Sequence, residues 1–205
     1  MNDPLKEINF LEQLASTGTT TTYKVTTNDS SDPSVVKLLR PYLANEGAIL
    51  SSLSKQLVAI SQVSHANILP TFEKNDYEGK HWIHRSYTDW PSLEQEFGKP
   101  RSISSILSIL YNIAEALEQY HINGLVHGNI KPSNIFLDPE SERVLVSDAG
   151  LSILLQNSSS RKTIRSKNSY VYSAPEISQN QPATRASDVY SLAMVSYLLL
   201  TGKLP

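Results

Sequence analysis

The chain has 205 residues, of which 40% are hydrophobic and 19% are charged. This composition is typical of one or two globular domains with a sizeable buried core, and it excludes a disordered chain. A net charge of −2 excludes a general electrostatic field for nucleic acid or anionic membranes. The absence of cysteine excludes disulfides and thiolate metal sites, as expected of an intracellular protein.

The N-terminal sequence MNDPLKEINFLEQ has neither the basic region nor the apolar segment of a signal peptide. The longest apolar run, near Leu192 to Leu200, is well short of the roughly 20 residues that span a bilayer. We therefore expect a soluble, cytoplasmic protein that associates with no membrane and no nucleic acid.

The first part of the chain favours β-structure. Residues 19–25 and 34–39 are rich in β-branched side chains and flank the turn sequence NDSSDP, which predicts a hairpin. Residues 68–72 and 81–85 predict two more strands around the sequence NDYEG. Between the two pairs, apolar residues at helical spacing predict a helix that starts near Glu46: Leu50, Leu53, Leu57 and Ile60.

The second part of the chain favours helices. From Ser102 to Gly124 apolar residues recur with a period of 3.6, which predicts a long amphipathic helix. Residues 135–137 and 144–146 predict a short hairpin, and residues 186–201 are apolar on almost every side, which is typical of a buried helix.

Polar residues that can carry chemistry gather between these elements. The loop VHGNIKPSNIFLD contains His127, Asn129, Lys131 and Asn134, and the strand after it runs into SDAG, with Asp148. Ala174-Pro175-Glu176 and the sequence SDVYSL, residues 187–192, follow. Four such motifs in this order and at this spacing argue against chance.

The four motifs resemble the catalytic loop, the D-F-G, the A-P-E and the D-x-W-S-L sequences of the eukaryotic protein kinase family, over nearly the whole chain. The resemblance implies an α+β, protein kinase-like fold of two lobes: a β-rich N-lobe, residues 1–85, and a mainly α-helical, incomplete C-lobe, residues 86–205. Lys131 is the choice of Ser/Thr kinases, and IKPSNIFL is similar to NIMA-related kinases.

The resemblance also implies a site for ATP and Mg²⁺. Val35-Val36-Lys37 resembles V-A-I-K, so Lys37 would contact phosphates, and Gln56 falls where the family has the glutamate that pairs with this lysine. Asn134 and Asp148 match the two metal ligands. In the catalytic loop Lys131 would neutralise phosphoryl charge, and Asn129 stands in place of the catalytic aspartate.

Several positions depart from the family pattern. The alignment puts Ala15, Thr17 and Thr20 at the three positions of the phosphate-covering glycines, and the remaining Gly18 is out of register. An ordinary exposed hairpin is therefore as good an interpretation as a phosphate cover. Gln56 brings no charge to Lys37, although it is also compatible with a half-exposed helix residue, and Ala149 replaces the phenylalanine of D-F-G.

Two functions follow from the resemblance. The first is a pseudokinase that binds ATP weakly or not at all and acts as a binding or scaffold module for protein partners. The alternative is an active Ser/Thr kinase that transfers the γ-phosphate of ATP to protein substrates. The departures favour the first.

Two further expectations concern the C-lobe. The activation segment contains Thr163, Ser166 and Ser169 beside basic residues, but Gly128 replaces the arginine that receives a phosphate there. The kinase helices that would cover residues 186–201 do not follow in this sequence, so we expect self-association through the apolar residues of this last helix: Leu192, Met194, Val195, Leu198 and Leu199.

Overall fold

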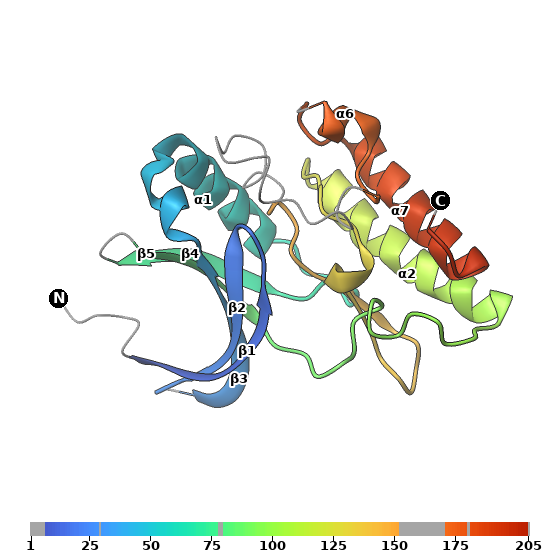
Figure 1. Cartoon of the computed structure of the whole chain (residues 1–205), viewed down its shortest axis with the longest axis horizontal. Helices are drawn as coiled ribbons and strands as arrows, with labels where there is room; N and C mark the ends of the chain where they lie inside the picture. Colours follow the sequence, from blue (N-terminus) through green and yellow to red (C-terminus); the bar gives the residue numbers. More distant parts are fainter. Residues whose placement is uncertain (1–6, 29, 78–79, 152–170, 180, 205) are drawn as a thin grey trace. The chain divides into compact units, whose positions relative to one another are not determined.

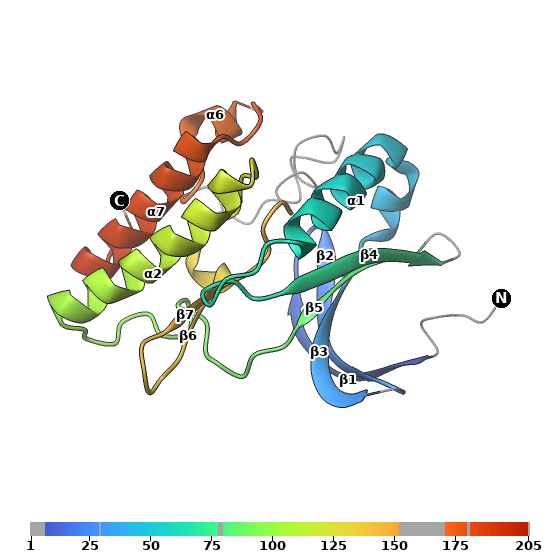
Figure 2. The same cartoon turned by 180° about the vertical axis from the view of Figure 1, so that it is seen from behind.

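The computed structural model describes residues 7–28, 30–77, 80–151, 171–179 and 181–204. They form two compact units. The first unit contains the described residues of 7–61 and 70–87, and the second contains those of 62–69, 88–151 and 171–204. Figures 1 and 2 show the elements of each unit from opposite sides.

An antiparallel sheet in the order β1-β2-β3-β5-β4 dominates the first unit. Its strands are β1 (Ile8–Ser16), β2 (Thr20–Thr27), β3 (Ser30–Leu39), β4 (Thr71–Tyr77) and β5 (Lys80–Ser86). Val25 and Val36 pack with Trp82 in a buried apolar cluster, which explains why β-branched residues dominate β2 and β3. The predicted hairpin and the predicted strand at residues 81–85 are confirmed.

For this sheet the sequence missed one strand and misplaced the bounds of another. Strand β1 was not predicted, because almost all of its residues are exposed and its pairing with β2 is interrupted twice, so no alternation marks it. Strand β4 begins at Thr71 instead of residue 68 and includes residues 75–77, which the sequence assigned to a turn. Polar side chains at a sheet edge are compatible with a strand, since β4 pairs on one side only.

A 3₁₀ turn, η2 (Pro41–Asn45), and helix α1 (Gly47–Ser61) follow β3. The helix packs on β4. The apolar residues that predicted α1 are all buried, together with Ile49. The predicted helix is therefore confirmed, and its apolar stripe faces the core of the unit.

The second unit is built on two long helices, α2 (Ile103–Ile122) and α7 (Arg185–Thr201), which pack on one another. The short helix α6 (Pro175–Ser178), the turn η3 (Pro132–Asn134) and the hairpin of β6 (Ile135–Leu137) and β7 (Val144–Val146) complete it. The Ser102 hydroxyl accepts a hydrogen bond from the Ser105 amide, 3.1 Å, and so caps α2. The predicted helices and hairpin are confirmed.

The segment at residues 62–69 belongs to the second unit, because it pairs with β7. The Leu69 amide donates to the Val146 carbonyl, 2.9 Å, and the Val146 amide donates to the Asn67 carbonyl, 2.8 Å. Ile68 forms a parallel bridge with Val146. This pairing explains why apolar residue 68 does not begin a strand of the larger sheet.

The last helix is better covered than the sequence predicted. Val195 and Leu198 are buried, and Leu192, Met194 and Leu199 are half-buried. No described helix is long and apolar enough to cross a membrane.

Candidate active site

Helix α2 ends where the candidate catalytic loop begins. Gly124 adopts φ +72°, a left-handed conformation that glycine reaches without strain. The Gly124 amide donates to the His121 carbonyl, 3.1 Å, and the Leu125 amide donates to the Tyr120 carbonyl, 2.9 Å. These bonds stop the helix and turn the chain toward His127.

His127 is completely buried and fixes the shape of the loop. Its Nδ1 accepts a hydrogen bond from the Asn129 amide, 3.2 Å, so Nε2 carries the proton and donates to the Ser147 carbonyl, 3.0 Å. The Tyr120 ring meets the imidazole edge to face, with 5.7 Å between centroids. Burial lowers the pKa of His127 and outweighs the opposite effect of Asp188 and Asp148, so this histidine is neutral.

Asp188, near the start of α7, holds the same loop from the other side. One carboxylate oxygen accepts from the His127 amide, 2.9 Å, and from His121 Nε2, 2.8 Å, and the other accepts from the Gly128 amide, 2.7 Å. The side chain of Asp188 is 1% exposed. Gly128 takes φ +67°, so its amide reaches the carboxylate without a steric penalty.

The loop presents Asn129 at its turn. The Asn129 amide is bound to His127 and its carbonyl accepts from Asn134 Nδ2, 2.8 Å, so the backbone on both sides of its side chain is held. The Asn129 side chain is half-buried and makes no hydrogen bond with another described residue. Lys131, also half-buried, precedes η3, and its carbonyl accepts from the Asn134 amide, 2.9 Å.

The short hairpin brings Asn134 and Asp148 toward each other. Ile135 of β6 pairs with Val146 of β7, and the Ser147 amide donates to the Asn134 carbonyl, 2.9 Å. Asp148 follows immediately, is buried, and adopts φ +66°. A left-handed conformation is uncommon for a residue other than glycine, and such strain is typical of functional sites.

The electrostatics of the loop also centre on Asp148. Burial raises the pKa of Tyr120, and the Asp148 carboxylate raises it further. The same carboxylate opposes the lowering of the His127 pKa. Asp148 therefore contributes negative charge to the buried side of the loop, where it shifts the pKa values of both His127 and Tyr120.

Asn134 and Asp148 fit a magnesium ion. The Nδ2 atom of Asn134 is used in the bond to Asn129, which leaves Oδ1 as the atom that can ligate. Mg²⁺ prefers oxygen ligands and binds through one or two carboxylates together with substrate phosphates and water. The described residues contain no group of three or more His, Cys, Asp or Glu suited to a metal ion.

The remaining predicted site residues lie in the first unit. Lys37 is half-buried in β3, where it pairs with Thr22 and Ile83. Gln56 is half-buried on α1. Gly18 lies in the turn between β1 and β2.

The sequence did not assign a role to His121 or Asp188. The usable signal was Asp188 inside SDVYSL, because a carboxylate in an otherwise apolar helix needs buried donors. Glu176 has a comparable local partner: the Ser187 hydroxyl donates to it and lowers its pKa. The predicted activation-segment residues Thr163, Ser166 and Ser169 lie outside the described residues.

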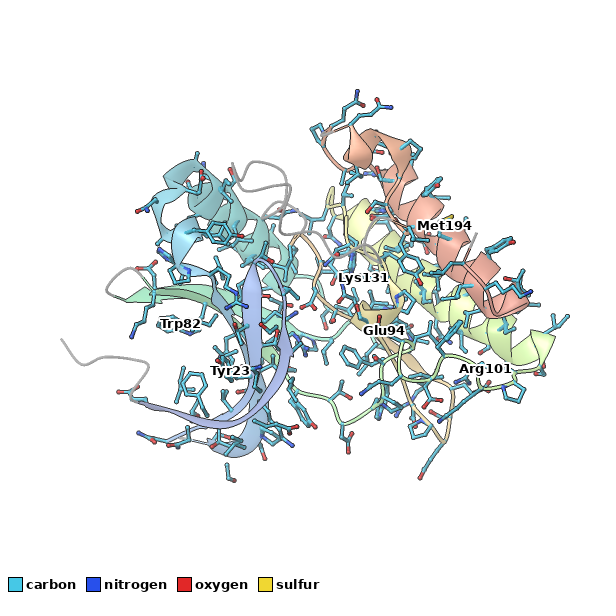
Figure 3. All side chains as sticks on the ribbon, in the orientation of Figure 1. Tyr23, Trp82, Glu94, Arg101, Lys131 and Met194 are labelled. Carbon is cyan, nitrogen blue, oxygen red and sulfur yellow. The ribbon has the colours of Figure 1, made fainter. Side chains whose placement is uncertain are left out.

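Side chains of both units are drawn in Figure 3, where Lys131 is labelled on its loop and Met194 on α7. Within the second unit, Asn129, Lys131, Asn134 and Asp148 all belong to one loop and hairpin. The role of these four residues as one site stays a prediction.

Comparison with known proteins identifies this arrangement. The family described as "Protein kinase domain" matches residues 8–205. The serine/threonine-protein kinase PrkC of Bacillus subtilis is 28% identical over 172 residues, which cover 83% of this chain and 26% of that protein. The serine/threonine-protein kinase PknJ of Mycobacterium tuberculosis is 26% identical over 196 residues, 94% of this chain and 33% of that protein. The chain thus spans about a quarter to a third of these relatives.

Solved structures agree on the fold. The kinase domain of PknI from Mycobacterium tuberculosis is 24% identical, covers 97% of this chain with a TM-score of 0.77, and is itself covered to 75%. The sheet of the first unit corresponds to a β-rich N-lobe and the helices of the second to a C-lobe, as the sequence predicted. The NIMA-related resemblance stays a prediction. With its family profile matched from residue 8 to residue 205, the chain belongs to the protein kinase family, and its relatives include serine/threonine kinases.

Proposed function

We propose that this chain is a pseudokinase domain, which binds ATP and Mg²⁺ weakly or not at all and serves as a binding or scaffold module for protein partners. The observation that carries the proposal is the position of Asn129. The Asn129 amide donates to His127 and the Asn129 carbonyl accepts from Asn134, so the backbone is held on both sides of the side chain, and Asp188 anchors the preceding residues. The backbone of the loop is thus held in place, and the group that it presents at this position is an amide.

An amide cannot take over the work of the missing aspartate. Its carbonyl oxygen can orient a substrate hydroxyl, but it accepts no proton near neutral pH and carries no negative charge. A positioned general base contributes roughly 10²–10⁴-fold to a rate. Phosphoryl transfer also depends strongly on positioning, which the uncharged Gln56 and the Ala149 of D-A-G weaken further.

If a nucleotide binds, different residues of this chain would contact its metal ion and its phosphates. Asn134 and Asp148 would hold Mg²⁺, which neutralises phosphate charge, and Lys37 and Lys131 would add positive charge. Gln56 would contribute orientation without charge. We therefore expect nucleotide affinity to depend on divalent metal and on the carboxylate of Asp148.

Calorimetric titration with ATP, with and without Mg²⁺, tests this division. Asp148→Asn retains the shape of the side chain and removes its charge, so it should abolish any metal-dependent binding. Asp32→Asn is the matched control, because Asp32 is exposed near the start of β3 and is none of the candidate site residues. Tight binding that needs no metal, or binding that Asp148→Asn leaves unchanged, contradicts the assignment.

An active Ser/Thr kinase is the second candidate, favoured by the retained Lys131, Asn134 and Asp148. A radiolabelled-ATP assay on generic Ser/Thr substrates separates the two candidates. The pseudokinase proposal expects no incorporation above that of the Asp148→Asn variant. Turnover typical of the family, lost in Asp148→Asn, would establish the second candidate instead.

A further inference from the structure

In the turn between β1 and β2, which consists of residues 17–20, every backbone carbonyl accepts a hydrogen bond. The carbonyl of Thr17 accepts from Arg40 Nε and Nη2, both 3.1 Å, and that of Gly18 accepts from the Tyr42 hydroxyl, 2.9 Å. The carbonyl of Thr19 accepts from the amide of Arg40, 2.8 Å. The fourth carbonyl, that of Thr20, accepts from the Thr17 amide, 2.8 Å.

The amides of the same turn are mostly used as well. Besides the Thr17 amide, those of Thr19 and Thr20 both donate to the Thr17 hydroxyl, at 3.3 and 3.0 Å. Among the four residues of the turn, only the amide of Gly18 makes no hydrogen bond with a described residue. Thr17 is therefore the centre of the turn, because its hydroxyl accepts from two of the three bonded amides.

Two side chains that lie beyond β3 fasten the turn from outside. Arg40 Nη2 also donates to the Ser16 hydroxyl, 2.6 Å. Tyr42 is partly buried, and this burial raises its pKa although the Arg40 charge opposes the shift. The Tyr42 phenol therefore keeps its proton at neutral pH and can donate.

We infer that Arg40, Tyr42 and the Thr17 hydroxyl form a latch that keeps the β1–β2 turn closed and withholds its amides from phosphate. A loop binds phosphate by presenting several free backbone N–H groups to it. In this turn three of the four backbone amides are already hydrogen-bonded. The hydrogen bonds that Arg40 and Tyr42 donate to the turn carbonyls would have to break before the turn could change its conformation. The inference deepens the proposed function, since it explains weak nucleotide binding by an occupied turn and not only by absent glycines.

Amide hydrogen exchange, followed by NMR on the protein without nucleotide, tests the latch itself. The amides of residues 17 and 40 report on the turn. We expect Tyr42→Phe to speed their exchange about fivefold, the effect of losing one ordinary hydrogen bond. Arg40→Ala loses three side-chain hydrogen bonds and should speed it more, and the double variant should speed it most. The Tyr23→Phe variant is the matched control, because it removes a hydroxyl from β2 away from the turn, and it should change neither amide.

Substitution of Thr17 provides a second test, with a smaller change of side chain. Thr17→Ala removes the central hydroxyl and should speed exchange at the amides of Thr19 and Thr20, whereas Thr17→Ser retains the hydroxyl and should leave both close to the wild-type rate. Unchanged exchange in Thr17→Ala and in the Arg40→Ala/Tyr42→Phe double variant would overturn the latch. This outcome is independent of whether the chain binds ATP.

Titration with sodium tripolyphosphate tests the withheld amides directly. In the wild-type protein the resonances of Thr17, Thr19 and Thr20 should not shift at millimolar concentrations, and in Thr17→Ala combined with Arg40→Ala and Tyr42→Phe they should. A saturable shift of these amides in the wild-type protein would overturn the inference. A kinase that proved active while its turn amides stayed unshifted would reject the proposed function and leave the latch intact.

Discussion

His127 shows how a single buried residue sets the chemistry of its loop. It is neutral because no water reaches it, and in this state one ring nitrogen donates and the other accepts. A protonated imidazole would offer two donors, and the Asn129 amide would then face a donor instead of an acceptor. Protonation is therefore incompatible with the observed loop, although the carboxylates of Asp148 and Asp188 partly offset its cost.

The stability of the protein should consequently fall in mild acid. The pKa of His127 is lowered in the folded state from 6.5, so the unfolded chain takes up a proton that the folded chain does not. Stability from this residue is complete above about pH 6.5 and is lost progressively below it. We expect the urea midpoint of the wild-type protein to drop between pH 7.5 and 5.5 by more than that of His127→Asn.

The variant itself should be less stable at pH 7.5, since it loses the imidazole packing against Tyr120. The two proteins differ only at residue 127, so the difference between the two pH profiles isolates His127. Parallel profiles would show that its protonation is not coupled to folding.

A second prediction concerns the substitution of Asn129. Asn129→Asp restores the missing carboxylate but changes neither Gln56 nor Ala149, so we expect a gain in phosphoryl transfer far below the roughly 10²–10⁴-fold value of a well-positioned base. The radiolabelled-ATP assay measures it. Asn123→Asp, at the exposed C-terminal cap of α2, carries the same change of charge and serves as the control. If Asn129→Asp alone raised the rate of phosphoryl transfer by the full roughly 10²–10⁴-fold, the reacting groups would already be correctly positioned.

Among the elements, α7 depends on its first turn. The Thr184 hydroxyl accepts from the Ser187 amide, 3.2 Å, and the Ser187 hydroxyl accepts from the Thr184 amide, 2.9 Å, which together form a capping box. The same turn contains Asp188, so the cap also orients the carboxylate that holds the catalytic loop. The stability of the helix end and the geometry of the site are therefore coupled.

Removal of this cap should destabilise the protein by about 1 kcal/mol, the usual cost of replacing an N-cap hydroxyl by alanine. Urea unfolding of Thr184→Ala measures the loss, and Thr184→Ser, which retains the hydroxyl, should recover most of it. Equal stability of the alanine and serine variants would exclude a capping role.

Elements with a buried face were predictable, and those without one were not. Val25 and Val36 marked β2 and β3 because these strands have one side in the core, whereas β1 has almost no buried residue to mark it. The site followed the same rule. The sequence could place Asn134 and Asp148 near each other because a short hairpin joins them. The hydrogen bonds of Arg40 to Thr17 and Ser16 join residues 23 and 24 positions apart, and only the folded sheet brings these residues together.

At the scale of the whole molecule, apolar residues remain exposed on one stripe of α7. Val189, Tyr197 and Leu200 recur at helical spacing, and the last two are 45% and 56% exposed. The apolar residues that the sequence singled out are instead buried or half-buried. We therefore expect self-association of this helix to occur through the exposed stripe, since contiguous apolar surface favours association.

Leu200→Lys should weaken this association without unfolding the chain. Sedimentation equilibrium over a range of concentrations measures it, and Val58→Lys is the matched control, since Val58 is 59% exposed on α1 in the first unit. A wild-type chain that stays monomeric at high concentration would refute the prediction, as would an equal effect of both variants.

Asp188 also determines when the candidate site can form. Its partners in the loop are 60 and 61 residues earlier in the chain. At a synthesis rate of roughly 5–20 residues per second, the loop exists for roughly 3–12 s before its anchor has been made. Throughout this interval the Gly128 and His127 amides lack the carboxylate that satisfies them, and closing so long a loop adds an entropic cost. The catalytic loop should therefore be among the last parts of a nascent chain to become resistant to proteolysis.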